Sequence, residues 1–134
     1  PAIIAGISVG TLVSLGSALA LAVAMGLTRE QYVTLLPKSV TTPIAMAVSE
    51  TLGGIVPVTV AAVILTGILG AMIAPLLIKI FHVTDPIAQG VAIGTCSHAI
   101  GTTKAMELGE LQGAMSSIAI GVSGLMTVLI SLFL

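Results

Sequence analysis

The sequence predicts an all-α membrane protein: a polytopic helical bundle of continuous spans and two broken helices. Apolar residues make up 57% of the 134 residues and charged residues only 7%, whereas soluble domains have about a quarter charged residues. Three uncharged stretches reach the about 20 apolar residues that a membrane span requires. Two further stretches of similar length are interrupted by Pro, Gly and polar residues. We therefore expect lipid to be the main environment of the chain.

The continuous spans are predicted at 2–27, 55–78 and 114–134. Small residues recur every four positions in several places, which allows helix backbones to approach closely in a membrane. These columns are Gly6, Gly10, Ser14, Ala18 and Ala22, then Gly90 and Gly94, and finally Gly113, Ser117 and Gly121.

The first interrupted stretch covers residues 31–52 and carries several helix signals. Its lead-in, Thr-Arg-Glu-Gln at 28–31, has the form of a capping box, so a helix should run from here to about Leu36. Pro37 and Pro43 then interrupt the helix, because proline lacks an N–H and disfavours helical geometry in the residue before it.

A second half-helix is predicted directly after this break, over residues 43–52. Thr42 suits the N-cap position and Pro43 the first helical position. Gly53 suits the position after the last turn, where a left-handed conformation is common. The stretch is therefore predicted as two half-helices joined at 37–43.

The second interrupted stretch, 86–112, repeats this arrangement. Asp85 and Pro86 predict a helix start, and a first leg is expected to run to about Ser97. A restart is predicted at Gly101-Thr102-Thr103, with the helix ending near Gly113. The Thr-Thr pairs of the two stretches match in a short repeat, TTPIAMAVSETLGG against TTKAMELGELQGA with one gap.

Only the continuous span 55–78 separates the two interrupted stretches. If both stretches cross the membrane fully, they run in the same direction. If one turns back as a re-entrant hairpin, the two run in opposite directions and their breaks can meet head-on. Since each stretch has enough residues on both sides of its break, full crossing is the expected arrangement.

The polar residues at the two breaks form the predicted binding site. Irregular backbone within lipid persists only where protein buries it or a wet cavity meets it, and transporters use such half-helix starts to bind anions. Helix starts at both Thr-Thr pairs would offer free N–H groups and the positive ends of two dipoles to one small carboxylate. The predicted substrate-binding residues are Lys38, Ser39, Thr41, Thr42, Ser97, His98, Thr102, Thr103 and Lys104. Glu50 and His98 are candidates for carrying a coupled proton.

Structural alternatives remain open for each of these residues. The breaks can be kinks in which Ser and Thr bond to their own backbones. Lys38 and Lys104 can mark helix ends by reaching the interface. A lone histidine such as His98 is often a hydrogen-bonded structural residue.

Other classes of function lack sequence support. The net charge of −1 without a basic run argues against nucleic acid as a partner, and a single cysteine, Cys96, excludes an internal disulfide or a multi-cysteine metal site. No phosphate-binding glycine loop, His-x-x-x-His pair or nucleophile with a positioned base is present. We therefore expect no enzymatic activity, no cofactor and no metal.

Three stretches resemble the LrgB/CidB family of bacterial inner-membrane proteins: LPKSVTTPIAMAVSETLGG, ILTGILGAMIAPLL and GTCSHAIGTTKAMELGELQGAMSS. The resemblance implies an antiholin-like regulator or effector of murein hydrolase activity, paired with a smaller LrgA/CidA holin-like membrane protein. A plastid relative carries glycolate and glycerate. Family members have further N-terminal helices, so 1–134 is expected to be a single membrane domain, the C-terminal part of a longer LrgB-like domain.

Two functional hypotheses follow from the residues and the resemblance. The main one is a multi-pass carrier of small 2-hydroxy or 2-oxo monocarboxylates of the glycolate, lactate or pyruvate type. The alternative is an antiholin-like scaffold that controls murein hydrolases together with a holin-like partner. The sequence leaves open the orientation in the inner membrane, the coupling ion and the oligomeric state, a homo-oligomer included.

Overall fold

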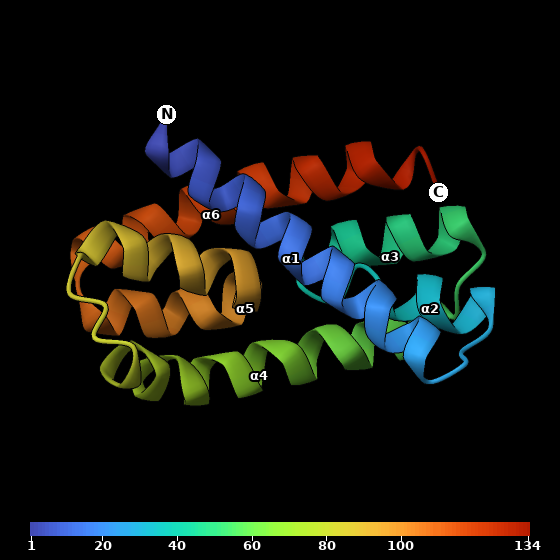
Figure 1. Ribbon diagram of the computed structural model, residues 1–134, viewed down its shortest axis with the longest axis horizontal. Helices are drawn as coiled ribbons and strands as arrows, with labels where there is room; N and C mark the ends of the chain where they lie inside the picture. The colour runs from blue at the N-terminus through green and yellow to red at the C-terminus, as the bar shows by residue number, and fades with distance from the viewer.

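The computed structural model describes all 134 residues and folds them into six helices (Figure 1). The helices are α1 (Ala2–Ala24), α2 (Arg29–Leu35), α3 (Thr42–Leu52), α4 (Val56–Ile80), α5 (Pro86–Leu108) and α6 (Glu110–Ser131). Three of them, α1, α4 and α6, are long and apolar enough to cross a membrane. The predictions of an all-α fold and of three apolar spans are therefore confirmed.

The three long helices lie roughly along the long axis of the molecule. In Figure 1, α1 crosses the bundle diagonally from the upper left to the lower right, α6 runs from left to right, and α4 runs back from right to left. The shorter helices α2 and α3 lie at the right end, and α5 lies at the left end beside α4. The two interrupted stretches thus occupy opposite ends of one bundle.

Helices α2 and α3 form the first hairpin, residues 29–52. Near the start of α4, the hydroxyl of Thr59 hydrogen-bonds with both the Thr34 carbonyl of α2 and the Ser49 hydroxyl of α3, each at 2.7 Å. Because both arms meet α4 at the same level, the chain must reverse between them. The non-helical tip of this hairpin is 36–41, which lies in the middle of the bundle (Figure 1).

Helix α5 forms the second hairpin, residues 86–108, by reversing direction at one residue. His98 has a φ of 43° and a ψ of −142°, which interrupt the helical geometry. Gly90 on the outgoing arm packs against Met115, and Met106 on the returning arm packs against Gly113, both in the first turns of α6. Both arms therefore end at the same level of the bundle.

Within the bundle each stretch turns back at its break, which differs from the arrangement expected of two stretches that cross a membrane fully. Helix α3 has 11 residues, which span about 16 Å, or half of a hydrocarbon layer about 30 Å thick. The hairpins open toward opposite ends, and their tips meet near the middle of α4. There His98 Nε2 lies 2.7 Å from the Val63 carbonyl oxygen, and Val40 and Ala45 of the first hairpin share a buried cluster with Val63.

Most predicted helix ends of the first hairpin are confirmed. The Thr28 hydroxyl accepts a bond from the Gln31 N–H while the Gln31 side chain accepts one from the Thr28 N–H, as a capping box requires. Gly53 adopts the left-handed conformation with a φ of 80°. One position is corrected: Thr41 is the N-cap of α3, and Thr42 is its first residue.

The second hairpin departs further from the prediction. Asp85 caps its start, with the carboxylate accepting a bond from the Ile87 N–H at 3.0 Å. The predicted restart at 101–103 is wrong, because the helix already resumes after His98. The predicted end near Gly113 is also wrong: Gly109, in an extended conformation, separates α5 from α6, and 110–112 belong to α6.

Small residues bring α5 close to its neighbours, as two of the predicted columns imply. A Cβ on Gly94 would lie 2.8 Å from the Cβ of Ala119 in α6, and a Cβ on Gly10 of α1 would lie 2.8 Å from the Thr95 hydroxyl oxygen. Side chains larger than hydrogen would force these helices apart. Close packing of the Gly90–Gly94 column is therefore confirmed.

Candidate functional site

The first hairpin tip is a buried, non-helical segment surrounded by helices. Its backbone makes two short turns, in which the Lys38 N–H donates to the Leu35 carbonyl and the Val40 N–H to the Pro37 carbonyl. Pro37, Ser39 and Val40 are buried, and Lys38 is half-buried. Pro37 and Pro43 thus flank an irregular backbone that protein, rather than lipid, covers.

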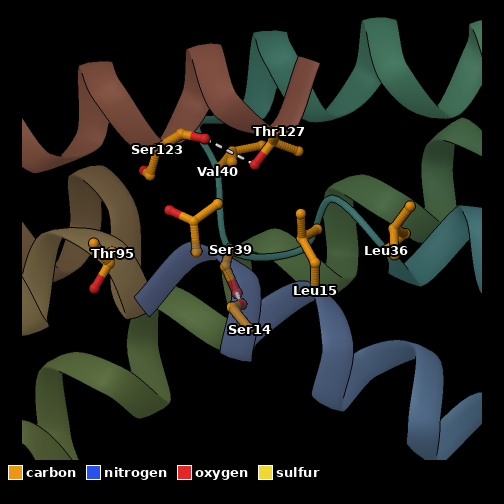
Figure 2. A pocket seen from close by; sticks show the side chains of 9 residues that line it. Ser14, Leu15, Leu36, Ser39, Val40, Thr95, Ser123 and Thr127 are labelled. Atoms are coloured by element: carbon orange, nitrogen blue, oxygen red, sulfur yellow. Dashed lines mark hydrogen bonds between the residues drawn. The ribbon is translucent and has the colours of Figure 1, made fainter. Parts of the chain in front are cut away.

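Beside this tip lies a small cavity lined by six hydroxyl side chains, which we call the hydroxyl cavity (Figure 2). Its volume is about 10 Å³. The hydroxyls come from α1, the first hairpin tip, α5 and α6, and the apolar lining comes from Leu15, Leu36 and Val40. The six are Thr11, Ser14, Ser39, Thr95, Ser123 and Thr127. Four separate parts of the chain therefore place polar groups around one point in an apolar bundle.

Four of these hydroxyls donate to carbonyls of their own helices. Thr11, Thr95 and Thr127 donate to the carbonyl four residues earlier at 2.8–2.9 Å, and Ser123 donates to the Ile120 carbonyl at 3.2 Å. With their protons directed to the backbone, their oxygens keep free lone pairs. This part of the cavity wall therefore offers hydrogen-bond acceptors.

Ser39 differs from the other hydroxyls of the cavity. Its oxygen accepts a hydrogen bond from the Ser14 hydroxyl at 2.7 Å (Figure 2) and another from the Lys38 ammonium at 3.4 Å. Lys38 has no carboxylate partner, because the one ion pair of the structure joins Lys104 to Glu107. A half-buried positive charge without a counter-charge therefore lies next to the tip.

The second hairpin tip holds His98 and Ser97, both buried. His98 Nε2 is 2.7 Å from the Val63 carbonyl oxygen, so Nε2 carries the proton that it donates. Two glycines of α4 make room: a Cβ on Gly67 would lie 2.7 Å from His98 Cε1, and a Cβ on Gly70 would collide with the Ser97 hydroxyl. His98 thus occupies a hydrogen-bonded position in the bundle, as in the structural alternative that the sequence left open for this residue.

The remaining predicted residues of the second stretch lie on the returning arm. Thr102 is buried and its hydroxyl bonds with the His98 carbonyl at 2.9 Å and with the Ser116 hydroxyl at 2.7 Å. Thr103 is exposed, and Lys104 pairs with Glu107 at 2.6 Å, an i, i+3 pair on one helix face. Thr102 and Thr103 are therefore mid-helix residues, and the predicted helix start there is not formed.

The other predicted residues of the first stretch lie at the start and on the outer face of α3. Thr41 and Thr42 are half-buried at its first turn, and Glu50 is exposed. Helix α3 packs against α4 and α6 but not against α5. The two Thr-Thr pairs therefore do not face each other across one site. Instead, the structure brings Ser39 together with Thr95.

Five of the six hydroxyl residues that line the cavity were not among the predicted site residues: Thr11, Ser14, Thr95, Ser123 and Thr127. A usable signal exists in the spans, because residues three or four apart share a helix face. The α1 pair is spaced by three residues and the α6 pair by four. Two hydroxyls on one face of an apolar span indicate a polar contact inside the bundle. No group of three or more His, Cys, Asp or Glu side chains is placed to hold a metal ion.

Comparison with known proteins gives a family but no template structure. The model of the LrgB-like family matches residues 1–134. The chain is 41% identical to the uncharacterized protein YwbG of Bacillus subtilis over 98% of its own length and 59% of the relative. It is 39% identical to the antiholin-like protein LrgB of Bacillus mycoides, over 96% of the chain and 56% of that protein. No solved structure matches.

The match extends over the whole sequence, including the tips of both hairpins and the hydroxyl cavity. The chain spans between 51% and 59% of the length of the curated relatives named YwbG, YxaC and LrgB. The family match and the three apolar helices together show a membrane protein, and the chain belongs to the LrgB-like family.

Proposed function

We propose that this chain acts in the bacterial inner membrane as part of an antiholin-like regulator of murein hydrolase activity. The match of the LrgB-like family to the whole chain carries this proposal, supported by relatives named antiholin-like protein LrgB. A holin-like membrane protein of the LrgA/CidA type is the proposed partner. The chain would act on the hydrolases through the membrane and carry out no catalysis itself.

Deletion and complementation of the full-length gene test this proposal. Cells lacking the protein should show altered autolysis rates and altered murein hydrolase activity in zymograms, and the intact gene should restore both. Gly70→Leu should fail to restore them, because a side chain there collides with Ser97 at the second hairpin tip. Gly121→Leu is the matched control, since a Cβ at that position meets nothing within 4 Å. Unchanged autolysis after deletion contradicts the proposal.

A carrier of small 2-hydroxy or 2-oxo monocarboxylates is the second candidate, and the paired hairpins favour it. We propose that both hairpins are discontinuous, re-entrant membrane segments. Helical breaks that meet near the middle of a bundle from opposite ends are typical of transporter binding sites. Lys38, half-buried at the tip and without a carboxylate partner, supplies the positive charge that a carboxylate needs. The Ser39 hydroxyl is the polar group next to the Lys38 ammonium at this tip.

Flux assays in liposomes that contain the full-length protein test this candidate. Lys38→Gln should reduce uptake of labelled glycolate, lactate or pyruvate by at least tenfold, while Lys79→Gln, at the exposed end of α4, should leave uptake unchanged. Absence of flux with the unmodified protein contradicts the carrier. Normal flux by Lys38→Gln shows instead that this lysine is not the anion contact.

A further inference from the structure

We propose that the hydroxyl cavity is the binding site of one buried water molecule, which joins the first hairpin tip to α1, α5 and α6. The volume of about 10 Å³ matches the space that one water needs at minimum. A carboxylate is several times larger. The inference goes beyond the proposed function, because it depends on neither a hydrolase nor a transported substrate.

The hydrogen-bonding capacity of the cavity wall identifies the ligand. Ser39 accepts two hydrogen bonds and donates to no other group of the protein, although the residue is only 7% exposed. Around it, the oxygens of Thr11, Thr95 and Thr127 have free lone pairs because their protons bond to helix carbonyls. The wall therefore offers one donor and several acceptors.

A water molecule satisfies this combination, because it can accept one bond from Ser39 and donate two to the surrounding oxygens. A bare cation cannot accept the Ser39 proton, and it would lie beside the Lys38 ammonium, whose nitrogen is 3.4 Å from the Ser39 oxygen. An anion would face the lone pairs of the threonines. A dry cavity would leave the Ser39 proton buried without an acceptor, which is unfavourable.

The bound water has a structural consequence for the hairpin tip. Ser39 and Thr127 line the same cavity, but no direct hydrogen bond joins them. Through the water, the tip and α6 become energetically coupled across a gap.

A double-mutant cycle on the purified full-length protein tests the water site. Ser39→Ala and Thr127→Val should each lower the melting temperature, and the double variant should show a shift clearly smaller than the sum, because either change removes the water contact. Ser39→Ala combined with Thr51→Val is the control, since Thr51 is exposed on α3 and bonds only to the Ala47 carbonyl. That pair should be additive.

Two further measurements identify the ligand. A high-resolution structure should show a single peak at about 2.7–3.0 Å from the Ser39 oxygen, as expected for O–H···O bonds. The melting temperature should be equal in sodium, potassium and choline chloride. Additive shifts for Ser39 and Thr127, or an empty cavity, contradict the proposal. A sodium-specific stabilisation that Ser39→Ala abolishes also overturns it, in favour of a cation site.

Discussion

The two hairpins reverse the chain in different ways. In the first, two separate helices with their own caps flank a six-residue tip, 36–41, that contains a proline. In the second, the helix reverses at His98 alone, with no proline nearby. Local sequence is sufficient to explain the break in the first hairpin, whereas the reversal at His98 occurs where the tip packs against Gly67 and Gly70 of α4. The difference teaches that a break in a membrane helix can be imposed by tertiary packing.

The largest loss of stability is expected from a substitution in α4 at the position where the second hairpin tip packs. Gly67→Val would place side-chain atoms against His98 and Ile100, whose atoms lie 2.7 and 2.8 Å from an ideal Cβ at this position. Overpacking of this kind in a buried site typically destabilises by about 1–3 kcal/mol and occasionally by more. Thermal unfolding of the purified protein should show a large fall in melting temperature or no folded protein.

The control for that change is Gly16→Val on α1, where a Cβ meets nothing within 4 Å. Its melting temperature should stay close to that of the unmodified protein. Equal destabilisation by both variants would mean that the glycines of α4 have no special role in seating the hairpin.

At the reversal itself, His98→Gly should be more stable than His98→Ala. Both substitutions remove the bond to the Val63 carbonyl, which is expected to destabilise by about 1–3 kcal/mol. Glycine adopts a φ of 43° freely, whereas alanine retains backbone strain of about 1 kcal/mol. Denaturation curves of the two variants should show this order, and the reverse order would mean that the backbone at His98 is not strained.

In the first hairpin, removal of the hydrogen bonds that join α2 and α3 to α4 should cause an intermediate loss of stability. Thr59→Val removes the hydroxyl that bonds with the Thr34 carbonyl and the Ser49 hydroxyl, a loss of about 1–2 kcal/mol for a buried group. Thr59→Ser keeps the hydroxyl and should recover most of the stability. Hydrogen exchange should show faster opening of 29–52 in Thr59→Val, and unchanged exchange there would rule out this link.

The smallest loss of stability is expected from a substitution at the N-cap of α2. Thr28→Ala breaks the capping box with Gln31 and should destabilise the first hairpin by about 1 kcal/mol. Thr28→Ser, which keeps the hydroxyl, is the matched variant. If Thr28→Ala instead loosened the second hairpin in hydrogen exchange, the two hairpins would be one cooperative unit.

The sequence is sufficient to predict what is encoded locally. The capping box at Thr28, the left-handed Gly53 and the Asp85 cap are each determined by a few neighbouring residues, and all three are present. The long apolar helices follow equally from composition. These features require no knowledge of which helices pack together.

The tertiary arrangement could not be read in the same way. The sequence predicts that the first leg of the second stretch ends near Ser97, but not that the chain turns back there, because the tip packs against Gly67 and Gly70, some 30 residues earlier. For the same reason the Thr102-Thr103 pair was predicted at a helix start and lies in mid-helix. The hydroxyl cavity depends on four segments meeting, and this contact exists only once the hairpins are formed.

Cysteine accessibility tests the opposed re-entrant hairpins most directly. In the full-length protein with Cys96→Ala, single cysteines would be introduced as Thr28→Cys, Gly54→Cys, Val83→Cys and Glu110→Cys, which flank the two hairpins. We predict that a membrane-impermeant thiol reagent labels positions 28 and 54 from one side of the membrane, and positions 83 and 110 from the other. Labelling of 28 and 54 from opposite sides, or of 83 and 110 from opposite sides, would contradict the account.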